Sequence, residues 1–230
     1  MDPELRQGAV DSLPLGLALV PVGLAFGYLG HTVGLSWWLA GLMSAVVYAG
    51  PSQFIAAGLL GVNAAVATIV ATTFVANLRY SLFAASLAPQ MRDAPRRRLA
   101  ALGHGIADGS YAVTIDHALT HPERPRKDRY LLGSFLVSFA FWVPGTVAGA
   151  LMGEVVPDTL AYALGFATPA IFIAFLVPYV RGWVPAVVML AAGLGTVAGN
   201  DLLPSGAGPL VAIIAASILG GALASRPTRP

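Results

Sequence analysis

The stretch VVYAGPSQFIAAGLL, residues 46–60, is apolar at both ends but carries Gly50, Pro51, Ser52 and Gln53 between them. Inside a helix, proline removes a backbone hydrogen bond and glycine loosens the turn. An unpaired backbone group is so costly in hydrocarbon that a break at membrane depth needs a cavity or a protein neighbour. The stretch therefore predicts a broken membrane helix near residues 50–53, with a polar segment available to a ligand.

The composition is that of a membrane protein. Of the 230 residues, 57% are hydrophobic and 10% are charged, whereas a soluble domain carries about 25% charged residues. Long apolar runs recur, rich in Ala, Leu and Gly rather than in strand formers, and each can cross the hydrocarbon as a helix. We predict an all-α, polytopic membrane protein with a single domain over residues 1–230. The seven predicted spans lie at about 13–33, 36–60, 64–88, 131–153, 159–180, 184–200 and 208–225.

What the sequence lacks argues against several classes of protein. It has no cysteine, which excludes disulfides, thiolate metal sites and thiol nucleophiles. It has no HExxH or GxSxG motif, no cofactor motif and no nucleic-acid module. His117 and His121 have the spacing of a metal pair, but Pro122 and the basic residues after it argue against one. We expect no enzyme, no cofactor, no metal site and no nucleic-acid partner.

Basic residues predict the orientation. Eight of the 13 Lys and Arg residues flank the hydrophilic segment at about 89–130, and the positive-inside rule places both flanks in the cytoplasm. The segment should therefore lie at the cytoplasmic interface, or dip into the membrane and return. Counting spans from there places the C-terminus in the cytoplasm and the N-terminus outside. The eight residues are Arg92, Arg96, Arg97, Arg98, Arg124, Arg126, Lys127 and Arg129.

A weak internal repeat indicates two related halves. AGPSQFIA at 49–56 resembles ATPAIFIAF at 167–175, and shorter matches precede and follow it in the same order. Inverted repeats of this kind build several secondary transporters. The repeat predicts a second helix break near 168–169, which would meet the first near mid-membrane. The predicted 3+3 layout has one repeat at about 13–88, another at about 131–200, and an added span at about 208–225.

Candidate ligand contacts gather at the two breaks. A broken helix offers free N–H groups to a carboxylate and free carbonyl groups to an ammonium. Polar side chains there would bind the substrate backbone and aromatic ones would form the wall, although a packed kink without ligand has the same pattern. The predicted contacts are Pro51, Ser52, Gln53, Phe54, Thr168, Pro169 and Phe172.

Further polar residues stand outside the breaks. Arg79 lies within a predicted span, where a charge faces a bundle interior or water, so substrate contact and structural pairing are both open for it. Asn77 and Asn200 either reach the substrate or tie helices together. His104 and Asp108 are four residues apart, a spacing that suits a proton relay on one helix face but equally a solvated helix.

The order of the motifs resembles a known family. PLGLALVPVGLAFGYLG (14–30), MSAVVYAGPSQFIAAGLL (43–60) and TTFVANLRYSLFAASLAP (72–89), followed by Asp108, resemble the AzlC family of branched-chain amino acid permeases. The resemblance implies a bacterial inner-membrane exporter of branched-chain and similar hydrophobic amino acids, commonly taken as proton-coupled, with a small AzlD-type membrane subunit as partner. Two residues depart from the family pattern: Pro51 replaces a small residue, and Gly109 replaces the second member of an acidic pair.

Together these features predict a secondary transporter in the lipid bilayer that exports a neutral hydrophobic amino acid by alternating access. The substrate would lie where the second and fifth spans cross, with Asp108 and His104 as candidate proton carriers. The alternative is an uncoupled channel or permease for another small neutral solute, which would use the same broken helices.

Overall fold

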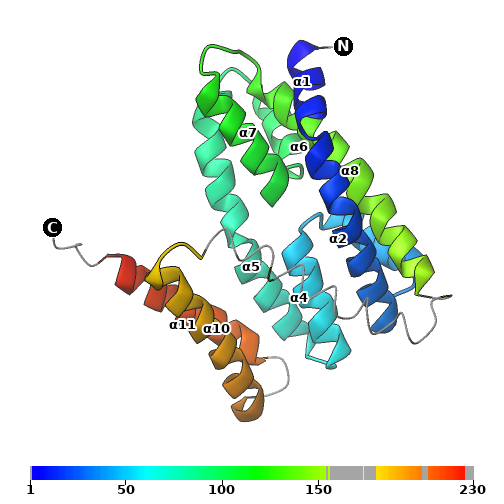
Figure 1. Cartoon of the computed structure of the whole chain (residues 1–230), viewed down its shortest axis with the longest axis vertical. Helices are drawn as coiled ribbons and strands as arrows, with labels where there is room; N and C mark the ends of the chain where they lie inside the picture. The colour runs from blue at the N-terminus through cyan, green and yellow to red at the C-terminus, as the bar shows by residue number, and fades with distance from the viewer. Residues whose placement is uncertain (1, 154, 156–172, 174–179, 204–206, 226–230) are drawn as a thin grey trace.

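The computed structural model describes residues 2–153, 155, 173, 180–203 and 207–225, which are almost entirely helical (Figure 1). Five of the described helical segments are long and apolar enough to cross a membrane: Leu13–Thr32, Val66–Met91, Lys127–Met152, Trp183–Leu202 and Ala207–Ala224. The helices are α1 Pro3–Asp11, α2 Leu13–Thr32, α3 Trp37–Val46, α4 Gly50–Gly61, α5 Val66–Leu87, α6 Arg96–Gly103, α7 Asp108–Thr120, α8 Lys127–Met152, α10 Trp183–Leu202 and α11 Ala207–Ala224, with a 3₁₀ turn η1 at Ala88–Met91. The predicted class, an all-α multi-pass membrane protein, is confirmed.

The predicted second span, 36–60, is two short helices, and the chain reverses between them. A methyl group placed on Gly61, at the end of α4, would come within 3.0 Å of Val33, just past the end of α2. Because α3 begins at Trp37, the start of α3 and the end of α4 lie at the same end of the bundle. The prediction that this stretch crosses the membrane is therefore wrong. The two helices form a re-entrant hairpin.

The reversal occurs at Val47–Ala49, slightly before the predicted break. Tyr48 has a φ of +44°, a left-handed conformation that a bulky residue rarely adopts, and it turns the chain. Gly50 and Pro51 already belong to the first turn of α4. A first helical turn accommodates proline, since the missing N–H would have no partner there. The glycine and proline thus begin the second helix, while the tyrosine makes the break.

The basic segment forms a second hairpin that enters from the opposite end. Near its start, Arg98 of α6 pairs with Asp128 in the first turn of α8 at 2.7 Å. Further along, Gly105 lies against Phe135, and on the way back His117 of α7 stacks on Tyr130, again near the start of α8. The segment therefore enters along α8 and returns, which is one of the two arrangements that basic residues at both ends predict.

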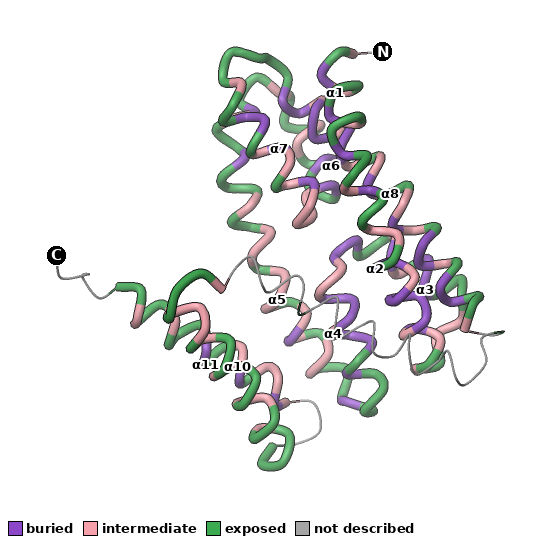
Figure 2. The backbone as a smooth tube through the Cα atoms, in the orientation of Figure 1, coloured by how far each residue is buried: buried purple, intermediate pink, exposed green. Residues whose placement is uncertain are grey.

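Helices α2 and α8 run parallel and in close contact. Going along α2, Gly16 lies against Phe141, Gly23 against Trp142 and Gly27 against Thr146, so both residue numbers rise together. Such close backbone approach is how small residues associate helices in lipid, where no hydrophobic drive acts between them. Figure 2 shows burial concentrated where these helices meet, whereas α10 and α11 are mostly half-buried or exposed.

The N-terminus lies at the same end as the basic segment. Glu4 of α1 contacts His117 at 3.0 Å and Arg124 at 3.4 Å, and Asp2 pairs with Arg126 at 2.7 Å. The N-terminus and the basic segment were predicted to lie on opposite sides of the membrane, and that prediction is wrong. The error follows from 36–60: counting that hairpin as a crossing inverts every assignment before it.

The predicted inverted repeat is not confirmed. It pairs residues 13–88 with 131–200 in opposite directions, but the first helices of the two units, α2 and α8, run parallel. Most of the predicted span 159–180, including the second break at 168–169, lies outside the described residues. A different inverted relation is visible: α2 with its hairpin α3–α4, and α5 with its hairpin α6–α7, point in opposite directions (Figure 1).

The two hairpin tips share a turn. In AGPS (49–52), the Ser52 hydroxyl donates to the Ala49 carbonyl at 2.9 Å. In ADGS (107–110), the Ser110 hydroxyl donates to the Gly105 carbonyl at 2.6 Å and lies 3.1 Å from the Ala107 carbonyl oxygen, while it accepts from the Ala107 N–H at 2.9 Å. In both, the serine is the third residue of the helix that leaves the tip. The same short motif therefore closes both reversals.

Candidate functional site

A cavity of about 470 Å³ lies where the two hairpin tips meet, within the usual size range of small-molecule sites. Helices α2, α4, α5, α7 and α8 and the Tyr48 turn all contribute to it. It is lined by Leu15, Leu19, Val22, Tyr48, Gly50, Pro51, Phe54, Arg79, Phe83, Ala107, Asp108, Gly109, Ser110, Ser138 and Trp142.

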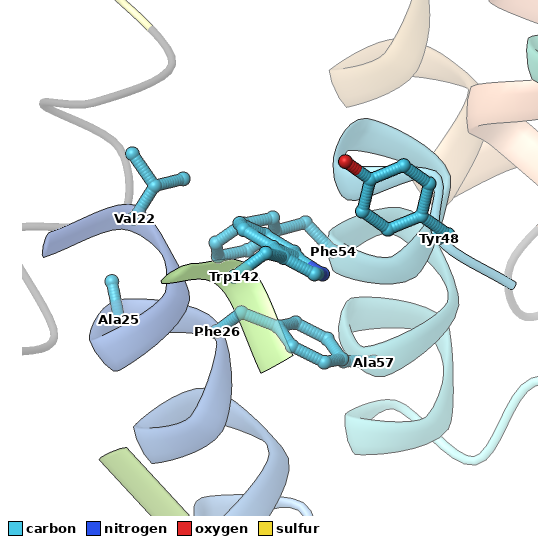
Figure 3. Packing of buried hydrophobic residues seen from close by; sticks show 7 residues of the cluster. All are labelled: Val22, Ala25, Phe26, Tyr48, Phe54, Ala57 and Trp142. Atoms are coloured by element: carbon cyan, nitrogen blue, oxygen red, sulfur yellow. The ribbon is translucent and has the colours of Figure 1, made fainter. Parts of the chain in front are cut away.

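One wall of the cavity is apolar and rigidly packed. Phe54 of α4 meets Phe26 of α2 edge to face, with ring centroids 5.3 Å apart, and Trp142 of α8 stacks on Phe26 at 6.1 Å. Figure 3 shows these rings together between α2 and α4, with Val22 beside them. Aromatic rings held from three helices have little freedom, so this wall gives the cavity a fixed hydrophobic surface.

One ion pair supplies the charge. Arg79 of α5 donates to Asp108 at the start of α7 at 3.0 Å, and the Tyr80 hydroxyl donates to the same carboxylate oxygen at 3.2 Å. Arg79 and Asp108 are the charged residues among those that line the cavity, and their side chains are 32% and 39% exposed. The pair fastens the second hairpin to α5 and leaves the cavity with no net formal charge.

Gln53 braces the first hairpin. Its side-chain oxygen accepts from the Ala49 N–H at 3.1 Å, and its amide nitrogen donates to Ser44 at 3.0 Å. Ser44 in turn meets Thr146 of α8 at 2.8 Å. Thr146 gives its own proton to the Trp142 carbonyl, so Ser44 donates to Thr146. This fully buried chain of bonds ties the tip of the hairpin to α8.

A second contact joins the two tips directly. Nε2 of His104 lies 3.0 Å from the Ala45 carbonyl oxygen, and because a carbonyl only accepts, that nitrogen carries a proton. The His104 ring also packs on Tyr48, with centroids 5.8 Å apart. This histidine therefore holds the tips together beside the cavity rather than lining it.

Two polar side chains on α8 have unused hydrogen-bonding capacity. Ser138 and Trp142 line the cavity and are 1% and 3% exposed, and their buried Oγ and Nε1 atoms have no hydrogen-bond partner of good geometry among the described residues. The Tyr48 hydroxyl lies near Ser138 without forming a hydrogen bond of good geometry. Neither residue was predicted from the sequence, although their spacing of four on an apolar helix places them on one face.

The structure divides the predicted residues into those in the cavity and those outside it. Ser52 and Gln53 serve the hairpin turn, as described above. Asn77 lies on α5 outside the lining, and its buried side-chain oxygen has no partner among the described residues. Asn200 is exposed near the end of α10 and approaches Gly208 of α11. The predicted residues in the lining are Pro51, Phe54, Arg79 and Asp108, while Thr168, Pro169 and Phe172 lie outside the described residues.

His104 and Asp108 do not share a helix face. Helix α6 ends at Gly103 and α7 begins at Asp108, so the chain turns between them. Within the described part of the chain, no three His, Asp or Glu residues converge as metal ligands. His117 instead pairs with Glu4 and stacks on Tyr130.

Known proteins resemble this chain over most of its length. An uncharacterized membrane protein of Archaeoglobus fulgidus is 32% identical over 219 residues, 94% of each chain. Inner membrane protein YgaZ of Escherichia coli is 28% identical over 200 residues, 85% of this chain and 81% of that one. Branched-chain amino acid transport protein AzlC of Bacillus subtilis is 26% identical over 167 residues, 72% of this chain and 64% of that one. No solved structure matches.

A family model described as AzlC protein matches residues 14–156, more than half of the chain. That match covers α2, both hairpins, α5 and α8, which together form the cavity. The chain belongs to the AzlC family.

Proposed function

We propose that the protein is a secondary transporter that exports branched-chain or similar hydrophobic neutral amino acids across the cytoplasmic membrane. The name of the Bacillus subtilis relative supports the substrate class. In this proposal the end that carries α1 and the basic segment faces the cytoplasm, because basic residues favour that side. The exposed apolar faces of α5, α10 and α11 meet lipid or a small AzlD-type membrane subunit.

The observation that carries the proposal is the chemistry of the cavity. Its walls are leucine, valine and aromatic side chains, which suit a hydrophobic substrate side chain. Its formal charges are one arginine and one aspartate, which balance each other. A neutral amino acid with an apolar side chain matches such a cavity, because it adds no net charge to it and its side chain packs against the apolar walls.

The hairpins provide a means of alternating access. They enter from opposite ends and their tips close on the cavity, so withdrawal of one tip would open it to one side only. The contacts that would have to break include the His104 bond to Ala45, the Asp108 pair with Arg79 and, for the first hairpin, the Ser44 bond to Thr146. Asp108 is the acid in the lining and is the proposed site of proton coupling.

Reconstituted protein tests the proposal. Purified protein in liposomes, with and without a co-expressed AzlD-type subunit, should accumulate leucine, isoleucine, valine or methionine against a gradient when a pH difference is imposed. Lysine and glutamate should not accumulate. An uncoupler should abolish accumulation, and facilitated equilibration without accumulation would replace the proposal by an uncoupled permease.

A matched pair of phenylalanine variants links transport to the cavity. Phe54→Ala removes part of the apolar wall, whereas Phe74→Ala removes a ring that is 65% exposed on α5. Transport should fall at least tenfold in Phe54→Ala and stay near wild type in Phe74→Ala, because only Phe54 lines the cavity. Equal activity in both variants would show that substrate does not pass through this cavity.

A further inference from the structure

The cavity contains buried donors with no acceptor. The indole N–H of Trp142 can only donate, and leaving a buried donor unpaired is costly. Figure 3 shows the indole nitrogen on the side of the ring that faces the first hairpin. Ser138 lies one turn earlier on α8, and its buried hydroxyl lies beside the Tyr48 hydroxyl without a hydrogen bond of good geometry. The Trp142 N–H is thus an unpaired donor on one side of the cavity, with the Ser138 hydroxyl one turn away.

A helix N-terminus faces the same space. Gly109 has no side chain, so it lines the cavity with backbone atoms. In the described structure, no acceptor reaches the N–H groups of Asp108, Gly109 or Ser110, which form the first turn of α7. Free N–H groups and the positive end of the helix dipole favour an anion there. The first turn of α7 and the α8 pair together offer donors from two elements.

The one carboxylate in the cavity does not supply an acceptor for these donors. Asp108 already accepts from Arg79 and Tyr80 through one carboxylate oxygen. Arg79 therefore balances the negative charge of Asp108, whereas the Trp142 N–H and the N–H groups in the first turn of α7 have no acceptor among the described residues. A ligand carboxylate gains partners here, but a ligand ammonium must compete with Arg79 for Asp108.

We propose that Trp142, Ser138 and the first turn of α7 form a subsite for the substrate carboxylate, and that the α-amino group contributes little to binding. This inference rests on the proposed function, because it assigns the orientation of the substrate within the same cavity. It predicts that the site accepts branched monocarboxylates that lack an amino group. The hydrophobic side chain of either ligand then lies against Phe54 and the α2 wall.

Four small ligands test the contributions of the substrate carboxylate and the substrate amino group separately. Binding to the purified full-length protein at pH 7 is measured by calorimetry for leucine, 4-methylpentanoate, 3-methylbutylamine and leucinamide. 4-Methylpentanoate should bind within tenfold of leucine, because it keeps the carboxylate and the branched chain. The two cations that lack a carboxylate should bind at least tenfold more weakly. Binding of 3-methylbutylamine but not of 4-methylpentanoate would overturn the subsite.

Conservative variants test the two side chains. Trp142→Phe keeps an aromatic ring without its N–H, and Ser138→Ala removes only the hydroxyl. Each should weaken binding of leucine and 4-methylpentanoate about tenfold, the usual effect of losing a hydrogen bond to a charged group. Neither should lower the melting temperature of the empty protein by the loss of a hydrogen bond, since neither group makes one in this structure. Trp183→Phe and Ser217→Ala, outside the cavity, are the matched controls.

The outcomes distinguish failure of the subsite from failure of the proposed function. If leucine binds and both cavity variants bind carboxylates as the wild type does, the subsite is wrong and amino acid transport stands. If none of the four ligands binds, with or without the small subunit, the proposed function fails as well. A lower melting temperature with unchanged affinity would assign Trp142 and Ser138 to structure alone.

Discussion

Gln53 shows how a polar residue in a membrane helix can serve the fold rather than the ligand. It is fully buried, and both ends of its amide are used, one by the Ala49 N–H and one by Ser44. An unpaired backbone N–H at the tip would otherwise cost stability at membrane depth. The side chain therefore replaces the backbone bond that the reversal at Tyr48 removes.

Replacement of Gln53 by Met should destabilise the protein while largely preserving ligand affinity. Methionine has a similar shape but leaves the Ala49 N–H and the Ser44 hydroxyl without this partner, a loss of about 2–3 kcal/mol in the free energy of unfolding. Thermal unfolding in detergent measures it, and Gln7→Met is the control because Gln7 bonds to Asp11 at an exposed site. Unchanged stability with lost binding would instead make Gln53 a ligand contact.

A substitution at Asp108 should separate proton coupling from substrate binding. Asp108→Asn keeps the shape of the side chain but removes the charge that Arg79 and Tyr80 hold. If this carboxylate carries the coupled proton, the variant should lose accumulation driven by a pH gradient while it still exchanges substrate across the membrane.

The control for this prediction is Asp201→Asn, which changes an exposed acid near the end of α10. Counterflow and gradient-driven uptake are measured in the same liposomes. Accumulation at the wild-type rate in Asp108→Asn would place proton coupling elsewhere.

At the scale of elements, the parallel contact of α2 and α8 is the frame that supports both hairpins. A side chain at Gly27 would overlap the backbone oxygen of Thr146, and one at Gly149 would overlap that of Leu24. These are contacts with backbone, which cannot rotate away as a side chain can. The two helices must separate if either glycine gains a methyl group.

Gly27→Ala should therefore lower stability and transport together. Overpacking typically costs about 1–3 kcal/mol, and a collision with backbone belongs at the upper end of that range. The matched control is Gly58→Ala on α4, where the added methyl meets nothing within 4 Å. Yield of folded protein and melting temperature are compared for the two variants. Equal yields and equal melting temperatures for the two variants would mean that α2 and α8 do not pack this closely.

At the scale of the whole molecule, the two hairpins change the topology. With α3–α4 returning to the end from which it entered, three described helices, α2, α5 and α8, alternate in direction from residue 13 to residue 152. Residues 7 and 97 then lie at one end and residue 62 at the other.

Cysteine labelling measures this topology, because the natural chain has no cysteine. Single cysteines at Gln7 and Arg97 should react only from the cytoplasmic side, and one at Val62, which is 59% exposed, only from outside. Impermeant reagents applied to intact cells and to inverted vesicles give the two accessibilities. Opposite accessibility of Gln7 and Arg97 would restore 36–60 as a crossing.

The sequence alone determined the class of the protein and the positions of its main helices. Length and apolarity are local properties, so α2, α5, α8, α10 and α11 begin and end within a few residues of the predicted spans. The glycine and proline at residues 50–51 likewise located the first interruption to within three residues, and the charge of Arg79 within a span and the spacing of Asp108 from His104 singled out these two residues.

Only the tertiary structure decided where the chain goes after each interruption. The direction beyond a break depends on a few backbone angles, here the positive φ of Tyr48, and on which neighbours satisfy the freed groups. Hydropathy reports neither, so it predicted a crossing where the chain forms a hairpin, and it therefore predicted the N-terminus at the end opposite the basic segment. The cavity, and the role of Ser138 and Trp142 in it, exist only because α8 packs beside two hairpin tips that are distant in sequence.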